Sequence, residues 1–338
     1  MNKGLVPALL PVVLLLTLIV AVGCVGNDSG NKTNLRVVPA GSLVVPFEGV
    51  EAGFEAAHPG VDVMVEPHGS IQAIRQVTDL HRPIDVVAVA DESLITDLMY
   101  RPVEGGGRNY TDGYLPFATN RMVIAYTNAS RFADEITADN WYDVLARPGV
   151  RVGISNPMLD AAGYRALMVL LLAENYYRNG TIFASIAGDH FSPPILPSTV
   201  NGTTTVTLPE VLKPAGGKVA VRDGSIFLMS LLGAGGIDYA FEYRNVAEAN
   251  GYRWVDLPVE IDLSSASFAD DYAKARVMLG FQRFSSIGRE RTGRPIMYAI
   301  TVPNNAPNPE LAREFEEYVV SQAERGGRGW PTPLAGAG

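Results

Sequence analysis

Cysteine is almost absent from this chain of 338 residues: Cys24 is the only one, so no disulfide can form within the chain. Histidine is scarce as well, and the four histidines show none of the spacings of a structural zinc site. Acidic residues outnumber basic ones, which gives a formal net charge of −9 and leaves no basic stripe to neutralise nucleic-acid phosphates. These scarcities argue against a disulfide-framed protein, a zinc protein and a nucleic-acid-binding protein.

Catalytic motifs are missing too. The sequence contains no Gly-x-Ser-x-Gly elbow, no metal triad and no nucleotide-phosphate loop. His68 and Ser70 lie two residues apart on one turn, which is poor geometry for a base and its nucleophile. We therefore expect neither an enzyme nor a cofactor, and a cell-surface hydrolase is the alternative of a different class.

The longest apolar run lies at the N-terminus, from Leu5 to Val22, and follows the positive charge of Lys3. Small residues stand directly before Cys24, as they do where lipoproteins are cleaved and lipidated. We expect a lipoprotein signal peptide over residues 1–23, lipidation of Cys24 and a flexible polar tether over residues 24–34. The rest of the chain would then lie at the extracellular face of the cell membrane, held by its lipid anchor. The alternative is an uncleaved anchor helix, because the run is nearly long enough to span a bilayer.

Potential N-glycosylation sites are compatible with an exported protein. Six Asn-x-Ser/Thr triplets occur, mostly in turn-like sequence. Chance alone would supply some of them, so they permit export without demonstrating it. They begin at Asn27, Asn31, Asn109, Asn128, Asn179 and Asn201.

One short phrase, Pro-x-Gly-Ser-aliphatic, occurs twice, over residues 39–43 and 67–71. Each copy follows an apolar run and precedes a helical pattern, so each is interpreted as a strand–turn–helix unit with spare N–H groups at the helix start. Two such turns form an anion site if they converge, as consecutive βα units of a parallel sheet would. The alternative is that Ser42 and Ser70 only cap their helices.

The remainder of the chain alternates strand and helix patterns, which indicates an α/β protein with mostly parallel sheets flanked by helices. We expect two lobes: a discontinuous lobe I (residues 35–125 and 253–325) and lobe II (126–252), followed by a loose tail (326–338). Residues 254–257 are expected to be a strand of lobe I. Ligands of such sheets bind at the carboxyl ends of the strands, here in the cleft between the lobes.

Several blocks of the chain together resemble the archaeal tungstate/molybdate-binding lipoproteins of ABC uptake systems. The blocks are Ala40 to Leu43, Asp139 to Tyr142, Ser155 to Arg165, Asp238 to Arg244 and Pro303 to Pro309. The resemblance implies a periplasmic-binding-protein fold of class II that closes over one oxyanion. It also implies delivery of that ion to an ABC permease and its ATPase, and we expect a monomer.

The resemblance further implies the residues that hold the ion. In lobe I these are Gly41, Ser42 and Ser70. In lobe II they are Asp160 with the N–H groups of Ala161 and Ala162, together with Ser225 and Tyr243, and Asp160 could contact the molybdenum or tungsten atom directly. Without the resemblance, Asp160 is an ordinary partner of a helix dipole, and Arg165 either balances the anion or pairs with an acid on its own helix.

One position departs from the family. Eighteen residues before the tyrosine the family has a glutamate, and this chain has Ser225. The departure predicts a tetrahedral oxyanion held by hydrogen bonds alone, with Asp160 coordinating by itself, protonated or pointing elsewhere. Glu242 is the nearest substitute carboxylate, but strand alternation places it on the opposite face from Tyr243.

Related ligands stay open. Sulfate and phosphate share the tetrahedral shape, and Asp160 could accept the proton of a phosphate. A ferric-iron-binding protein of the same fold would need several tyrosines clustered with a histidine, and the sequence shows no such pairing. The sequence therefore predicts an extracellular solute-binding protein for molybdate or tungstate, with another tetrahedral oxyanion as the alternative.

Overall fold

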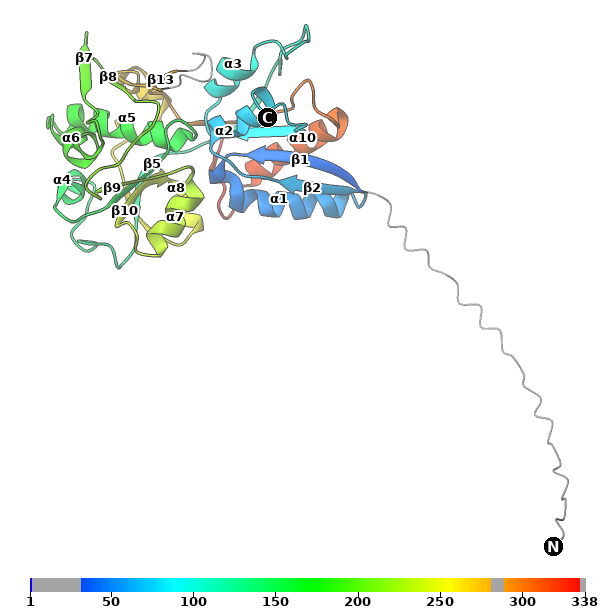
Figure 1. Cartoon of the computed structure of the whole chain (residues 1–338), viewed down its shortest axis with the longest axis horizontal. Helices are drawn as coiled ribbons and strands as arrows, with labels where there is room; N and C mark the ends of the chain where they lie inside the picture. Colours follow the sequence, from blue (N-terminus) through cyan, green and yellow to red (C-terminus); the bar gives the residue numbers. More distant parts are fainter. Residues whose placement is uncertain (2–31, 281–288, 335–338) are drawn as a thin grey trace.

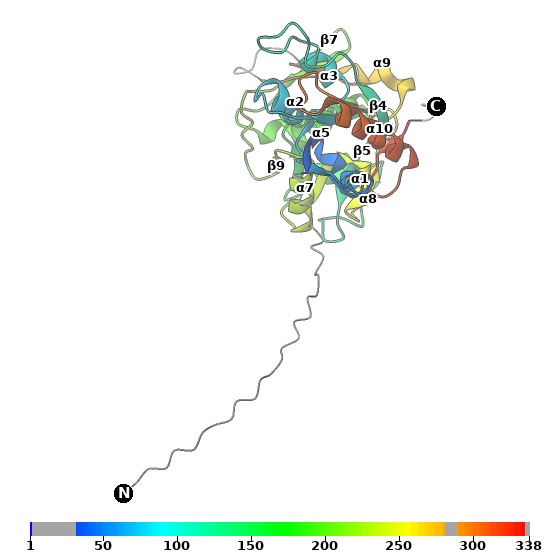
Figure 2. The ribbon, with the colours of Figure 1, turned by 90° about the vertical axis from the view of Figure 1, so that its right-hand side faces the viewer.

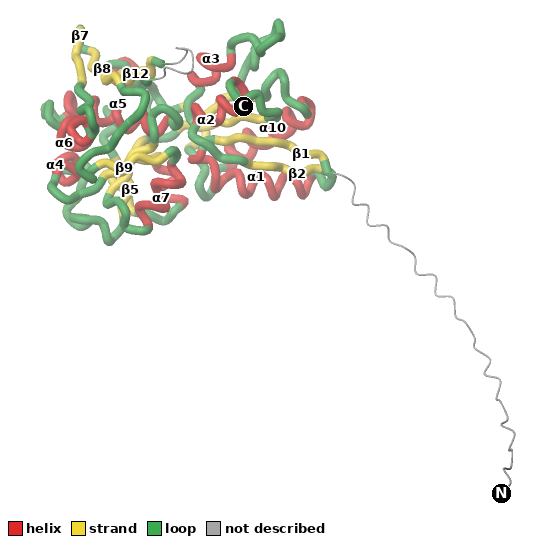
Figure 3. The backbone as a smooth tube through the Cα atoms, in the orientation of Figure 1, coloured by secondary structure: helices red, strands yellow, loops and turns green. Residues whose placement is uncertain are grey.

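The computed structural model describes residue 1 and residues 32–280 and 289–334, so nearly all of the expected signal peptide, Cys24 and most of the expected tether lie outside the described residues. The elements gather into two lobes that lie side by side (Figure 1). The strands of each lobe form separate groups with helices around them (Figure 3). Figure 2, turned so that the first lobe faces the viewer, shows α1 (Val44–Ala57) and α10 (Pro309–Arg325) in front of the second lobe. The α/β, two-lobed prediction is confirmed.

Lobe I is built on a six-stranded sheet of order β15-β4-β14-β3-β1-β2. The parallel strands β1, β2 and β3 begin the lobe, and each is followed by a helix, so their carboxyl ends share one edge of the sheet. The strands are β1 (Thr33–Pro39), β2 (Val61–Val65), β3 (Val86–Val89), β4 (Leu115–Thr119), β14 (Met297–Thr301) and β15 (Thr332–Pro333); besides α1 and α10, the helices are α2 (Ser70–Thr78) and α3 (Ser93–Met99).

Lobe II is built on a five-stranded sheet of order β11-β5-β10-β6-β9. Its parallel strands β10, β6 and β9 have their carboxyl ends at one edge. The strands are β5 (Met122–Tyr126), β6 (Val152–Ser155), β9 (Val219–Arg222), β10 (Tyr239–Tyr243) and β11 (Arg253–Asp256); the helices are α4 (Trp141–Ala146), α5 (Ala161–Tyr176), α6 (Ile182–Ile186), α7 (Ser225–Gly233) and α8 (Arg244–Ala249).

A third sheet, of order β13-β12-β8-β7, packs its strand β12 against α5. Helix α5 therefore lies between two sheets, which explains why its sequence is apolar nearly all round instead of on one face. The remaining elements are β7 (Pro197–Val200), β8 (Thr203–Thr207), β12 (Ala275–Met278), β13 (Glu290–Thr292), α9 (Ala269–Tyr272) and the 3₁₀ turns at Gly41–Leu43, Gly188–His190 and Ala266–Phe268.

Two expectations about the path of the chain are corrected. Strand β11, expected in lobe I, pairs antiparallel with β5 of the lobe II sheet. Strand β5 is Met122–Tyr126, so residues 122–125, which were also expected in lobe I, belong to the lobe II sheet as well. The short helix α8 and the tight turn at Gly251, whose φ is +68°, send the chain straight back along that sheet. The chain thus leaves lobe I between β4 and β5, and its return comes after β11. The expected lobe limits, otherwise untested, stay a prediction.

The expected loose tail is likewise wrong for residues 326–334. Strand β15 pairs with β4 at the edge of the lobe I sheet. Trp330 packs near Phe47 and Phe117, with ring centroids 6.5 Å from each. An aromatic ring that finds an apolar cluster holds the chain after α10, in spite of the glycines before it.

Glu316 on α10 yields a prediction about stability. Burial raises the pKa of Glu316 to about 7, against the opposing attraction of Arg313. The carboxyl group therefore binds its proton more tightly in the folded chain, and the free energy of unfolding falls as the pH rises from about 4.5 through 7. Glu316→Gln should remove this fall and unfold at higher urea concentration at pH 8, by about 1–2 kcal/mol after allowance for solvent screening. At pH 4 the variant should match the parent, and Glu324→Gln, at an exposed glutamate of the same helix, serves as the control.

Candidate functional site

The two Pro-x-Gly-Ser phrases lie beside one another at the edge where β1 and β2 end. Ala40 and His68 form an isolated parallel bridge, and the Gly41 N–H donates to the His68 carbonyl oxygen at 2.7 Å. The predicted convergence of the two turns is confirmed. The same bond occupies the Gly41 amide, so Gly41 positions the turns and does not offer that donor to a ligand.

Ser42 and Ser70 are buried, and neither caps a helix. Ala40 and Gly69 hold the N-cap positions, without side-chain capping bonds. The Ser42 Oγ accepts a hydrogen bond from the Tyr298 hydroxyl at 2.8 Å, and the Ser70 Oγ accepts from the Ala90 N–H at 3.0 Å. Each hydroxyl keeps its own hydrogen for donation. The interpretation of both serines as plain helix caps is therefore wrong.

The first amides of α2 are used across the lobes. The N–H groups of Ile71 and Gln72 both donate to the Leu159 carbonyl oxygen of lobe II, at 3.0 and 3.1 Å. Gly69 approaches the same peptide so closely that an added Cβ would lie 2.4 Å from the Leu159 oxygen. The described conformation is thus one in which the lobes are in contact, and Gly69 makes that contact sterically possible.

The third turn, before α5, brings in Asp160. This residue holds the N-cap position of α5 and is 3% exposed, so its carboxyl group is buried and not on an open helix end. Burial raises the pKa of its carboxyl group, although the N–H groups of Ala162 and Ser70 and the Ser155 and Ser225 hydroxyls oppose that rise. Ala161 and Ala162 are fully buried, and their N–H groups precede the first turn of α5.

Ser225 links two carboxyl groups. Its hydroxyl donates to Asp160 Oδ2 at 3.3 Å and also lies close enough to Glu242 to lower that side chain's pKa. Burial nonetheless raises the pKa of Glu242 to about 8, and the neighbouring Asp160 adds to the rise. Glu242 lies on the face of β10 opposite to Tyr243, as strand alternation predicts. Helix α7 packs against β10 and begins with Ser225, so Glu242 lies near Ser225 and Asp160 all the same.

Tyr243 lies on the α5 face of β10 and contacts Arg165. The Arg165 Nη1 donates to the Tyr243 hydroxyl at 2.7 Å and to the Ala90 carbonyl of lobe I at 2.6 Å. Its Nη2 lies 3.4 Å from Asp91 Oδ2, and the charges of Arg165 and Arg291 lower the pKa of Asp91 although burial opposes them. Arg165 therefore pairs across the lobes, and not with an acid on its own helix. The Tyr243 hydroxyl retains its hydrogen for a further acceptor.

Some residues around Ser42 were missed by sequence reasoning. Asn245 on α8 donates to the Ser42 carbonyl oxygen at 2.9 Å and to the Gly329 oxygen at 2.7 Å. Asn120 donates to Asn245 Oδ1 and to the Tyr298 hydroxyl, at 2.8 and 3.2 Å. Tyr298 lies 256 residues from Ser42, and no local pattern marks it.

The arrangement as a whole is a buried, hydroxyl-rich site between the lobes. Hydroxyl groups from both lobes and the start of α5 can donate to an anion, whereas Asp160 and Glu242 can accept a proton or bind an electrophilic atom. In residues 32–280 and 289–334 no cluster of three or more His, Cys, Asp or Glu side chains forms a metal site. In the same residues no helix is both long and apolar enough to cross a bilayer.

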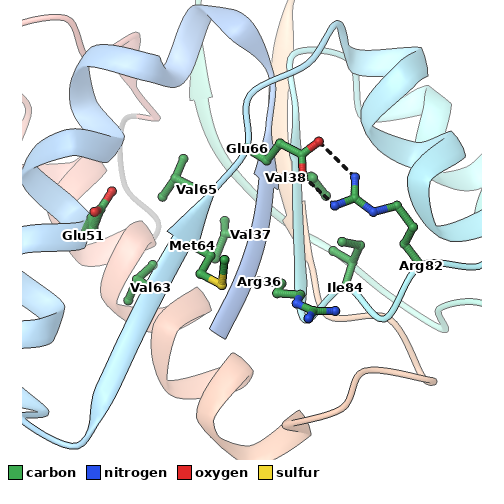
Figure 4. Close-up of a pocket in the computed structure, with 10 residues that line it drawn as sticks. All are labelled: Arg36, Val37, Val38, Glu51, Val63, Met64, Val65, Glu66, Arg82 and Ile84. Atoms are coloured by element: carbon green, nitrogen blue, oxygen red, sulfur yellow. Dashed lines mark hydrogen bonds and ion pairs between the residues drawn. The ribbon is translucent and has the colours of Figure 1, made fainter. Parts of the chain in front are cut away.

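A separate groove of about 410 Å³ lies in lobe I, along β1 and β2. Val37, Val63 and Ile84 line it, and the Glu66–Arg82 ion pair at 2.6 Å stands at its rim (Figure 4). None of the predicted ligand-binding residues lines this groove. The groove is therefore distinct from the site between the lobes.

Comparison with known proteins gives the family. The family model of the bacterial extracellular solute-binding proteins matches residues 35–326. This chain belongs to that family. The molybdate/tungstate-binding protein WtpA of Thermococcus kodakarensis is 38% identical over 327 residues, covering 93% of this chain and 87% of its own length. An uncharacterised solute-binding protein of Methanoculleus marisnigri is 42% identical over 318 residues, covering 92% and 85%.

Solved structures support the fold of this extracellular solute-binding protein. The periplasmic molybdate-binding protein of Azotobacter vinelandii matches with a TM-score of 0.54 at 15% identity, covering 84% of this chain and 92% of its own. The sulfate-binding protein SubI of Mycobacterium tuberculosis matches with a TM-score of 0.55 at 15% identity, covering 90% and 88%. At such low identity these matches concern the fold alone. The predicted family and the predicted periplasmic-binding-protein architecture are both confirmed.

Proposed function

We propose that this solute-binding protein captures molybdate or tungstate between its lobes and delivers it to an ABC permease. The observation that carries the proposal is the meeting of buried hydroxyl groups from both lobes around the start of α5. Ser42 and Ser70 come from lobe I, and Ser225 and Tyr243 come from lobe II. Relatives of 38% identity that are named for binding these two ions support the choice of ligand.

Binding rests on preorganised donors in a buried site. The hydroxyls of Ser42, Ser70 and Tyr243 and the amide of Ala161 replace the hydration shell of the ion, and each hydrogen bond to a charged oxygen is strong. The Ser225 hydroxyl and the Ala162 amide orient Asp160. Because the donors come from two lobes, the bound ion holds the lobes together. The permease would then distinguish the closed, loaded protein from the open one.

Asp160 has a specific part in this proposal. As a free carboxylate beside a dianion it would be repelled, so it either coordinates the molybdenum or tungsten atom or carries a proton. A phosphate ligand is the second candidate, favoured by the same observation, because a carboxylate can accept the proton of hydrogenphosphate. The lipid anchor at Cys24 and the position at the extracellular face of the membrane belong to the proposal as well.

Calorimetric titration of the purified, ligand-free chain tests the proposal. Molybdate and tungstate should bind, whereas sulfate and phosphate should give no heat. Binding of phosphate or sulfate in place of the metal oxyanions would keep the architecture and change the ligand. Absence of heat with all four ions would overturn the proposal.

A further inference from the structure

The triplet Asn201-Gly202-Thr203 forms the tip of a hairpin in the third sheet. Strand β7 pairs antiparallel with β8, and the pair of Val200 with Thr203 closes a turn of two residues. Asn201 has φ +48° and Gly202 has φ +77°, as an Asn-Gly turn of type I′ requires. Figure 1 shows β7 on the side of lobe II that lies away from lobe I. The turn is therefore remote from the site between the lobes.

Both polar side chains of this triplet are accessible. Asn201 is exposed and Thr203 is partly exposed. Within residues 32–280 and 289–334, neither side chain takes part in a hydrogen bond or an ion pair. N-glycosylation attaches a glycan to the asparagine amide of an Asn-x-Ser/Thr triplet on the surface of an exported protein. The amide and the hydroxyl that such a reaction needs are both available at this turn.

The triplets at Asn109 and Asn128 are engaged within the fold. The hydroxyl residue of the first is Thr111, which is 2% exposed and donates to a backbone carbonyl oxygen at 2.8 Å. The hydroxyl residue of the second is Ser130, which is 8% exposed and accepts a backbone N–H at 2.9 Å. The Asn128 Oδ1 also accepts from Arg253 Nη1 at 3.2 Å. Neither hydroxyl is open to a second protein once the chain has folded.

The triplet at Asn179 is closed on itself. The Asn179 Oδ1 accepts hydrogen bonds from the N–H and the hydroxyl of Thr181, at 3.1 and 2.7 Å. The amide and the hydroxyl of this triplet thus occupy each other in a local turn. Among the triplets of the described residues, the one at Asn201 alone combines an exposed asparagine with a hydroxyl that has no partner in the fold.

We propose that Asn201 is an N-glycosylation site of the folded chain. The family is extracellular, which is where surface triplets of this kind are modified. The donor is an oligosaccharide linked to a polyprenyl phosphate. The Asn201 Nδ2 forms a bond to the anomeric carbon of the sugar, and the bond from that carbon to the phosphate oxygen breaks. The phosphate leaves with the electron pair, and the amide proton passes to a base of the transferase.

Mass spectrometry of the full chain, purified from cells of its own organism, tests this site. The peptide that contains Asn201 should be heavier than its sequence by the mass of a glycan, and fragment spectra should place that glycan on Asn201. The peptides that contain Asn109, Asn128 and Asn179 should have their unmodified masses. An Asn201 without a glycan would overturn the proposal, and a glycan on any of the other three would overturn the selection by the fold.

Substitutions at Thr203 separate the triplet from the turn. Thr203→Val keeps Asn201 and a β-branched side chain in β8 but removes the hydroxyl, so the glycan should be lost completely. Thr203→Ser restores the triplet and should retain the glycan. Thr205→Val is the matched control, because Thr205 lies on the same face of β8 and outside the triplet. A glycan that persists in Thr203→Val would overturn the proposal. The readout is mass and not affinity, so the result is independent of the proposed function.

Discussion

Replacing Gly69 with alanine is expected to prevent the lobes from closing while each lobe stays folded. The new Cβ would lie 2.4 Å from the Leu159 oxygen and 2.9 Å from Asp160 Cβ, both in lobe II. The backbone itself tolerates alanine, because Gly69 has φ −62° and ψ 147°. The clash exists only when the lobes meet, so the substitution acts on closure and not on local conformation.

The expected consequence is a loss of affinity for molybdate of at least about a hundredfold, because apparent affinity falls with the fraction of chains able to close. Calorimetry measures that loss, and small-angle X-ray scattering should show that molybdate compacts the parent and not the variant. Gly49→Ala is the control, since no atom lies within 4 Å of a Cβ added there. A Gly69→Ala chain that compacts and binds like the parent would show that closure does not need this contact.

The sequence predicted the parts of the site that depend on local pattern. Each strand–turn–helix unit carries its own signal, so the turns at Ser42, Ser70 and Asp160 were placed without knowledge of their contacts. The rule that parallel strands end at one edge of a sheet then predicted their convergence. The Ser225–Asp160 contact follows in the same way, because each residue stands at the start of a helix behind a parallel strand.

The contacts that the sequence could not predict join residues far apart in the chain. Tyr298 reaches Ser42 from a strand of the returning chain, and Asn245 reaches the Ser42 carbonyl from the other lobe. Strand alternation predicts that Glu242 points away from Tyr243. It does not show that helix α7 covers that face of β10 and brings Ser225 to Glu242. Which side chains a given face meets depends on the packing of α7, and no period in the sequence records that packing.

Arg165 is the residue whose loss is expected to cost the most stability. It is 1% exposed, and its guanidinium contacts three groups from two lobes: the Ala90 carbonyl, Asp91 and the Tyr243 hydroxyl. Arg165→Met fills much of the same space but leaves the buried Asp91 with one cation fewer. Removing one partner of a buried ion pair typically costs ~3–5 kcal/mol, because the other charge stays buried. Urea denaturation at pH 7 should show a loss of that size.

A lysine at the same position separates charge from geometry. Arg165→Lys keeps the positive charge near Asp91 but cannot donate to Ala90 and Tyr243 from one planar group, so it should recover only part of the lost stability. Arg108→Met is the control, because Arg108 and its partner Asp112 are both exposed; its loss should cost less than about 1 kcal/mol. Equal effects of Arg108→Met and Arg165→Met would contradict the structural importance of the interlobe contact. A large loss of stability in Arg165→Met, without a comparable loss in the control, would show that the Arg165 guanidinium stabilises the fold by its contact with Asp91 between the lobes. That contribution does not depend on a bound anion.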